Sequence, residues 1–205
     1  IDALIEGVIA ISPQAHFSLR EEILQLNALV DDLHLLAMAD LRALPCYFED
    51  IDAVSIVESV VQRFSLRASQ RGLRLLLQSK PEEPIQVRWD ANRMEQLLGN
   101  LLENSLRYTD APGQVFLQIQ SDGGQVTIIV EDTAPGLSTI DLMRIFEPLY
   151  RADPARGREA GGSGLGLAIC QQIAHAHHGV IRAKASPKGG VQFLIELPSE
   201  GDTEA

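Results

Sequence analysis

The chain has 205 residues, of which 45% are hydrophobic, and this is enough to bury one core of about 150 residues with a helical hairpin beside it. A formal net charge of −11 argues against nucleic acid as a partner, because a phosphate backbone selects basic surfaces. No apolar run approaches the ~20 residues of a membrane-spanning helix, so we expect no membrane contact by this part of the protein.

Residues 1–43 predict the C-terminal part of a helical hairpin. One helix ends at Ser12-Pro13, and a second is expected from about Leu19 to Leu41. The second helix carries a coiled-coil seam, with apolar residues alternately four and three positions apart: Leu19, Ile23, Leu26, Val30, Leu33 and Ala37. This stripe favours a dimeric four-helix bundle. An amphipathic helix lying on the chain's own globular domain is the alternative.

Residues 44–50 are interpreted as a linker, 51–200 as one domain and 201–205 as a tail. After an extended stretch at 47–51, Asp52 is expected to cap a helix that runs to about Arg71. Strands are predicted at 73–78, 85–89, 115–120, 125–131, 180–185 and 191–197, and further helices at 95–108, 138–146 and 164–178. The aperiodic segment 152–162 predicts a mobile lid. This order predicts an α+β fold, an α/β sandwich with a mixed sheet and helices on one face.

Three short blocks in this domain have the chemistry of a nucleotide site. Asn100 and Asn104 lie four residues apart on a predicted helix, so they share one face and offer amide oxygens to Mg²⁺. Asp132 opens a glycine-containing turn after an apolar strand, where its carboxylate can accept a hydrogen bond from an adenine amino group. The third block, at 161–168, places four glycines before an apolar helix, so bare backbone N–H groups can meet phosphate oxygens.

Each block alone has a simpler interpretation, as a solvated helix face, an Asx cap or an ordinary loop. Together, in this order, they predict ATP and Mg²⁺ as cofactors. A Walker loop is excluded because no glycine cluster is followed by Lys at the required spacing. A dinucleotide fingerprint is excluded because the block at 161–168 has neither the right position in the chain nor an acidic partner about 20 residues further on.

The three blocks resemble the N, G1 and G2 boxes of sensor histidine kinases in the GHKL ATPase superfamily, and Phe146-Glu-Pro-Leu-Tyr-Arg151 is similar to their F box. The resemblance covers nearly the whole chain and is greatest to the Bae-type envelope-stress sensor kinases, at 100–109 and 161–170. It implies the Bergerat fold and a histidine protein kinase that uses Mg-ATP. It also implies onward transfer to a response regulator receiver domain, a homodimer through the helical hairpin, and a cytoplasmic position within an inner-membrane sensor.

By position, the resemblance implies a role for each matching residue. Asn104 would ligate Mg²⁺, with Asn100 beside the phosphates or in the metal shell. Asp132 would bind the adenine amino group, and Gly136 would let the ring approach. Arg151 would reach the terminal phosphates as the catalytic cation. The remaining implied contacts are with phosphate and base by Arg107 and Tyr108, with the lid by Phe146, and with the triphosphate by Gly162, Gly164, Leu165 and Gly166.

Two residues depart from the family pattern. Ala134 replaces the middle glycine of the usual Asp-x-Gly-x-Gly, so its backbone must avoid a left-handed conformation or accept roughly 1 kcal/mol of strain. Leu149 stands where the F box often has a second aromatic residue.

The histidines do not match a phosphoacceptor box, in which His is followed by an acidic residue and Leu-Arg-x-Pro. We expect the acceptor His to lie outside this sequence, so that this fragment binds nucleotide without autophosphorylating. His175, His177 and His178 are interpreted as cations at a helix C-terminus rather than as a metal site. Two alternatives stay open, namely a GHKL clamp ATPase and a degenerate kinase that serves as an interaction module.

Overall fold

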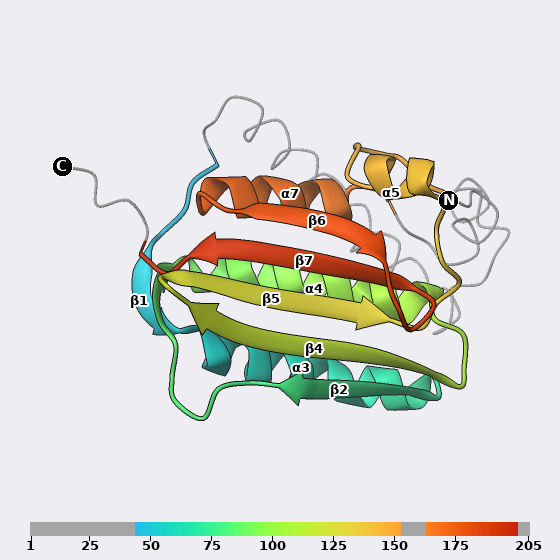
Figure 1. Cartoon of the computed structure of the whole chain (residues 1–205), viewed down its shortest axis with the longest axis horizontal. Helices are drawn as coiled ribbons and strands as arrows, with labels where there is room; N and C mark the ends of the chain where they lie inside the picture. Colours follow the sequence, from blue (N-terminus) through green and yellow to red (C-terminus); the bar gives the residue numbers. More distant parts are fainter. Residues whose placement is uncertain (1–43, 153–162, 201–205) are drawn as a thin grey trace, which may run out of the picture.

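The structure, a computed structural model, describes residues 44–152 and 163–200 (Figure 1). Five strands form one sheet in the order β2-β4-β5-β7-β6. Their bounds are Leu73–Ser79 for β2, Gly113–Asp122 for β4, Gln125–Asp132 for β5, Val191–Pro198 for β7 and Val180–Ala185 for β6. β2 and β4 are parallel and the other neighbours are antiparallel, which confirms the predicted mixed sheet.

Three helices cover one face of this sheet, as predicted: α3 (Ala53–Gln70), α4 (Ala91–Tyr108) and α7 (Gly166–Ala176) (Figure 1). The helices bury apolar residues at helical spacing, and in α4 these include Leu97, Leu101 and Leu102. The strands alternate, so that Leu117 of β4 and Ile128 of β5 are buried between neighbours that are more exposed or polar. The main core therefore lies between the sheet and its helices.

Two smaller elements complete the described fold. A short helix α5 (Thr139–Arg144) follows β5, and β1 (Glu49–Asp52) pairs with β3 (Gln86–Trp89) as a separate antiparallel ribbon. Asp52 caps α3 as predicted, since its Oδ1 accepts hydrogen bonds from the backbone N–H groups of Val54 and Ile85, both at 3.0 Å. The same carboxylate thus fixes the start of α3 and the segment before β3.

The bounds of helices α4 and α7 differ from the prediction. α4 begins four residues earlier than expected, because the Asp90 carboxylate accepts a hydrogen bond from the Arg93 N–H at 3.0 Å and caps the helix there. α7 is shorter at both ends, because Gly164 and His178 have φ values of 75° and 58°, which a right-handed helix cannot contain.

The interpretation of the three histidines as cations is wrong for His177. This side chain is 1% exposed, and burial lowers its pKa below the ordinary value of 6.5. Its Nε2 accepts a hydrogen bond from the Asp90 backbone N–H at 3.0 Å, while Nδ1 lies 2.9 Å from the Ile173 carbonyl oxygen. The ring is therefore neutral, and it joins the end of α7 to the start of α4.

The predictions for the hairpin at 1–43, for the lid at 153–162 and for the tail at 201–205 lie outside the described residues. Of the helices within 44–152 and 163–200, none has the length and apolar character needed to cross a membrane.

Candidate nucleotide-binding site

A cavity of about 450 Å³ lies among α4, the end of β5, the α5 region, the first turn of α7 and the start of β7. This volume falls within the range of about 300–1,000 Å³ that is typical of small-molecule sites. Five residues predicted from the sequence line it, namely Asn104, Tyr108, Asp132, Gly136 and Arg151. The further lining residues are Ala134, Pro135, Leu137, Ser138, Asp141, Ile145, Tyr150, Ala152, Leu167, Val191 and Phe193.

Asp132 ends β5 and is 2% exposed. Its Oδ1 accepts hydrogen bonds from the backbone N–H groups of Val191 at 3.0 Å and Ala134 at 3.2 Å, and its Oδ2 accepts one from the Ser105 hydroxyl at 2.9 Å. Burial raises the pKa of the Asp132 carboxyl, and these three donors oppose the shift because they stabilise the charged form.

The same hydrogen bonds leave Asp132 with spare accepting capacity. A carboxylate has about four acceptor positions, two on each oxygen. Oδ1 has two donors and Oδ2 has one among residues 44–152 and 163–200, so one position on Oδ2 is open. Because Asp132 lines the cavity, this position suits the N–H of a ligand's amino group.

Helix α4 contributes residues that line the cavity and residues that form hydrogen bonds to the other two blocks. Asn104 and Tyr108, one turn apart, line the cavity. Asn100, a turn earlier, donates a hydrogen bond from Nδ2 to the Gly166 carbonyl oxygen at 3.3 Å and thereby joins α4 to the first turn of α7. Ser105 is fully buried and holds Asp132. The first sequence block thus meets both of the others in space.

The turn after β5 is closely packed. Ala134 is 4% exposed, and the non-glycine residues with positive φ in the described part of the chain are Leu149 and His178. Of the two outcomes that the sequence left open, Ala134 therefore avoids the left-handed conformation. A Cβ atom on Gly136 would lie 3.0 Å from the Gly189 carbonyl oxygen, which is closer than most Cβ contacts, so the two turns approach each other tightly here.

Arg151 supplies positive charge to the cavity wall. Its Nη2 is buried and has no hydrogen-bond partner among the residues that the structure describes. An unpaired buried donor is costly, and a donor on a charged group more so, which makes this atom a natural partner for an anionic ligand.

The residues before Arg151 are held by their own contacts. The Tyr150 hydroxyl donates to Asp141 Oδ1 at 2.7 Å, and the Arg144 guanidinium lies 4.2 Å from the centre of its ring. Phe146 packs edge-on against Phe193, with ring centres 6.4 Å apart. Tyr150 is thereby fixed in the cavity wall, whereas Phe146 contacts the lining residue Phe193 and is not itself part of the lining.

The third block is described from Ser163 onward, and Gly162 lies outside the described residues. Gly164 has a φ of 75°, and its carbonyl oxygen accepts a hydrogen bond from the Leu149 N–H at 2.9 Å. Leu149 itself has a φ of 64° and is 68% exposed. A Cβ on Gly164 would lie 3.0 Å from Leu149 Cα. Glycine is therefore required where this block passes the F-box-like segment.

Several predicted residues do not border the cavity. Leu165 is 4% exposed and belongs to the core, and the lining includes Leu167 but not Gly164 or Gly166. Arg107 is also outside the lining, with its guanidinium 3.8 Å from the Glu103 carboxylate.

Sequence reasoning missed other contributors, among them Tyr150, Ser105 and Val191. Tyr150 sits in the quoted F-box-like segment, so its position was a usable signal. Ser105, a small hydroxyl residue among the apolar residues of α4, was a weaker one. Val191 acts through its backbone N–H, which no residue type reveals.

Comparison with known proteins extends this picture. Residues 89–201 match the family described as "Histidine kinase-, DNA gyrase B-, and HSP90-like ATPase". The chain is 42% identical over 204 residues to the signal transduction histidine-protein kinase BaeS of Escherichia coli K12, an alignment that covers 100% of this chain and 43% of BaeS. It therefore spans less than half the length of that relative.

Two solved structures are also similar. Acinetobacter baumannii histidine kinase AdeS superposes with a TM-score of 0.79 at 27% identity, covering 97% of this chain and 90% of AdeS. Full-length ShkA in complex with AMPPNP gives a TM-score of 0.80 at 29% identity, covering 93% of this chain and 39% of ShkA. The chain belongs to the family of histidine kinase-, DNA gyrase B- and HSP90-like ATPases.

Proposed function

We propose that this chain is the catalytic and ATP-binding core of a two-component sensor histidine kinase. It binds Mg-ATP and delivers the γ-phosphoryl group to a histidine, from which the phosphate passes to an aspartate of a response regulator receiver domain. The whole protein would act as a homodimer through the hairpin at 1–43, with this core as the cytoplasmic portion of an inner-membrane sensor. The observation that carries the proposal is the meeting of Asp132, Asn104 and Arg151 around one cavity.

Each of the three residues would bind a different part of Mg-ATP. The open acceptor position on Asp132 Oδ2 takes a hydrogen bond from the adenine amino group. Asn104 offers a neutral amide oxygen to Mg²⁺, an ion that usually takes only one or two protein ligands and completes its shell with phosphate oxygens and water. Arg151 Nη2, buried without a partner in the described part of the chain, donates to the terminal phosphates.

The protein contributes to phosphoryl transfer mainly by positioning the nucleotide and neutralising the charge of its phosphates, because the reaction needs little covalent participation by the protein. The N-terminus of α7 adds a positive helix end beside the cavity, where Leu167 lines the wall. Mg²⁺, when bound, supplies further positive charge to the triphosphate. The similarity to BaeS supports the kinase assignment, and the AMPPNP complex of ShkA supports an adenine nucleotide as ligand.

The first test is calorimetric titration of the chain with Mg-ATP and Mg-ADP. We expect saturable binding of both, and absence of binding to the unmutated protein would refute the proposal in favour of an interaction module. The second test uses the full-length parent protein with ATP labelled at the γ-phosphate. Label should appear as an acid-labile phosphohistidine and then move to a receiver domain. Release of inorganic phosphate without a labelled histidine would instead indicate a clamp ATPase.

A further inference from the structure

The turn between β6 and β7, residues 186–190, lies directly against the proposed adenine contacts. The turn is closed by hydrogen bonds from Ser186 N–H to the Gly190 carbonyl at 2.8 Å and from Gly189 N–H to the Ser186 carbonyl at 3.0 Å. A Cβ on Gly190 would lie 2.1 Å from Asp132 Oδ1, so the turn backbone is pressed against the Asp132 carboxylate. The next residue, Val191, donates its N–H to the same oxygen.

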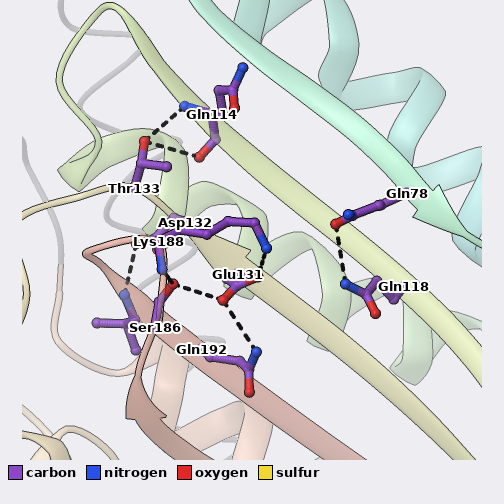
Figure 2. A network of polar contacts seen from close by, with 10 residues as sticks. Gln78, Gln114, Gln118, Glu131, Asp132, Thr133, Ser186, Lys188 and Gln192 are labelled. Atoms are coloured by element: carbon purple, nitrogen blue, oxygen red, sulfur yellow. Dashed lines mark hydrogen bonds and ion pairs between the residues drawn. The ribbon is translucent and has the colours of Figure 1, made fainter.

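The other side of the turn is held by the neighbour of Asp132 in the chain. Figure 2 shows Ser186, Lys188 and Gln192 gathered around the Glu131 carboxylate. Glu131 Oε1 accepts hydrogen bonds from the Ser186 hydroxyl at 2.7 Å and from Gln192 Nε2 at 3.3 Å, and Oε2 forms an ion pair with Lys188 Nζ. Lys188 Nζ also lies 4.5 Å from the centre of the Phe116 ring.

These contacts stabilise the ionised form of the Glu131 carboxyl group. The residue is 1% exposed, so burial alone would raise the pKa of its carboxyl, but the hydrogen bonds from Lys188 and Ser186 outweigh burial and lower it. A buried carboxylate with two donors from the turn, Ser186 and Lys188, and a third from Gln192 of β7 fixes that turn more firmly than a surface ion pair could.

Alternation along β5 explains how two consecutive carboxylates hold one turn. Successive side chains of a strand point to opposite faces of the sheet. Asp132 points to the helix-covered face, where it accepts from Ser105 of α4, and Glu131 points to the opposite face, where it meets Phe116 and the turn. The beginning of the turn is thus held by Glu131 and its end by Asp132.

We propose that Glu131 and Lys188 are positioning residues for nucleotide recognition. By anchoring the 186–190 turn, they hold the Val191 N–H on Asp132 Oδ1. This contact fixes which oxygen of Asp132 is left to accept a hydrogen bond from the base. The proposal rests on the proposed function, since it concerns the same adenine contact. It assigns part of the base selectivity to a cluster on the face of the sheet that the helices do not cover.

The chemistry of the two purines gives the expected direction. Adenine presents an amino group, a donor, where guanine presents a carbonyl oxygen, an acceptor. With the turn anchored, Asp132 offers an acceptor in a fixed direction and favours adenine. With the turn released, Oδ1 loses the Val191 donor and the carboxylate can rotate, so the preference for adenine should weaken while the already poor binding of GTP stays the same.

The test compares two double variants. E131L/K188A removes both members of the ion pair, so that the buried Glu131 carboxylate is not left as an unpaired charge. The matched control, R182A/E196L, removes the ion pair between β6 and β7 that involves more exposed side chains. Both proteins are titrated with Mg-ATP and Mg-GTP, and the hydrogen exchange of the Val191 amide is followed by NMR. K188R, which keeps the cation, should behave like the unmutated protein.

We expect E131L/K188A to bind Mg-ATP about tenfold more weakly, with Mg-GTP affinity unchanged and faster exchange of the Val191 amide, and R182A/E196L to show none of these changes. Unchanged ATP affinity, or equal losses for both nucleotides, would overturn the proposal. If E131L/K188A does not fold, K188M is judged by the same criteria. Failure of the unmutated protein to bind ATP would instead refute the proposed function, and the Val191 exchange rates would still decide whether the ion pair holds the turn.

Discussion

Replacing Asp132 with asparagine tests the adenine contact while preserving the shape of the side chain. The asparagine Oδ1 can still accept from the N–H groups of Val191 and Ala134, which hold the native Oδ1 at 3.0 and 3.2 Å. Its Nδ2 then takes the place of Oδ2, and the Ser105 hydroxyl can rotate to accept from it. The fold should therefore be retained.

The effect on binding follows from the reversal of hydrogen-bonding character at that atom. Nδ2 is a donor, and it would face the donor of the adenine amino group. A hydrogen bond to a charged group contributes about 1.5–3 kcal/mol, and its loss corresponds to a fall in affinity of about ten- to a hundredfold. GTP should lose nothing, because the guanine carbonyl can accept from Nδ2, so the selectivity for adenine should disappear.

Calorimetry with Mg-ATP and Mg-GTP measures both effects, and thermal unfolding checks that the variant is folded. Asp122→Asn, at the exposed end of β4, is the matched control for the change in charge. An unchanged affinity of folded D132N for Mg-ATP would refute the reasoning. Equal losses for ATP and GTP would also contradict it, since they would show a general disturbance of the cavity and not a lost contact with the base.

Asn104→Ala should remove the dependence of ATP binding on Mg²⁺, measured by titration with and without a chelator, and an unchanged dependence would place the metal elsewhere. Arg151→Ala should weaken ATP binding by about tenfold and ADP binding less, since the buried Nη2 is expected to reach the γ-phosphate. Equal losses for ATP and ADP would contradict that contact. Substitution of the exposed Arg182 by alanine is the control. The free energy of unfolding should decrease as the pH falls below 6.5, because burial lowers the pKa of His177 in the folded protein and the unfolded chain takes up the proton more readily. This contribution is fully present above pH 6.5, and denaturant unfolding of H177Q should lack the decrease.

Much of the fold was predictable because its signals are local. Gly123 and Gly124 lie between the strands predicted at 115–120 and 125–131, and both adopt the positive φ that a tight hairpin turn needs. Asp52 predicted the start of α3, since a cap bonds only to residues close to it in the chain. The start of α4 was missed because Asp90, an equally good cap, was not read as one.

For the candidate site, too, some residues could be predicted from the sequence and others could not. Residue types in order along the chain were enough to choose Asp132, Asn104 and Arg151, because each carries its chemistry in its own side chain. The predicted contacts of Gly164 and Leu165 stay predictions, and the structure adds Leu167 to the cavity wall and shows that Leu165 is buried.

The sequence by itself thus determined the kind of fold and the family, and it predicted an adenine nucleotide as ligand and the side chains that we propose to bind it. Tertiary structure alone decided how those side chains are held. Val191 donates to Asp132 across 59 positions of sequence, and His177 accepts from Asp90 across 87. Such contacts depend on distances set by the packing of the whole sheet and its helices, and a backbone donor such as the Val191 N–H leaves no mark in the order of residue types.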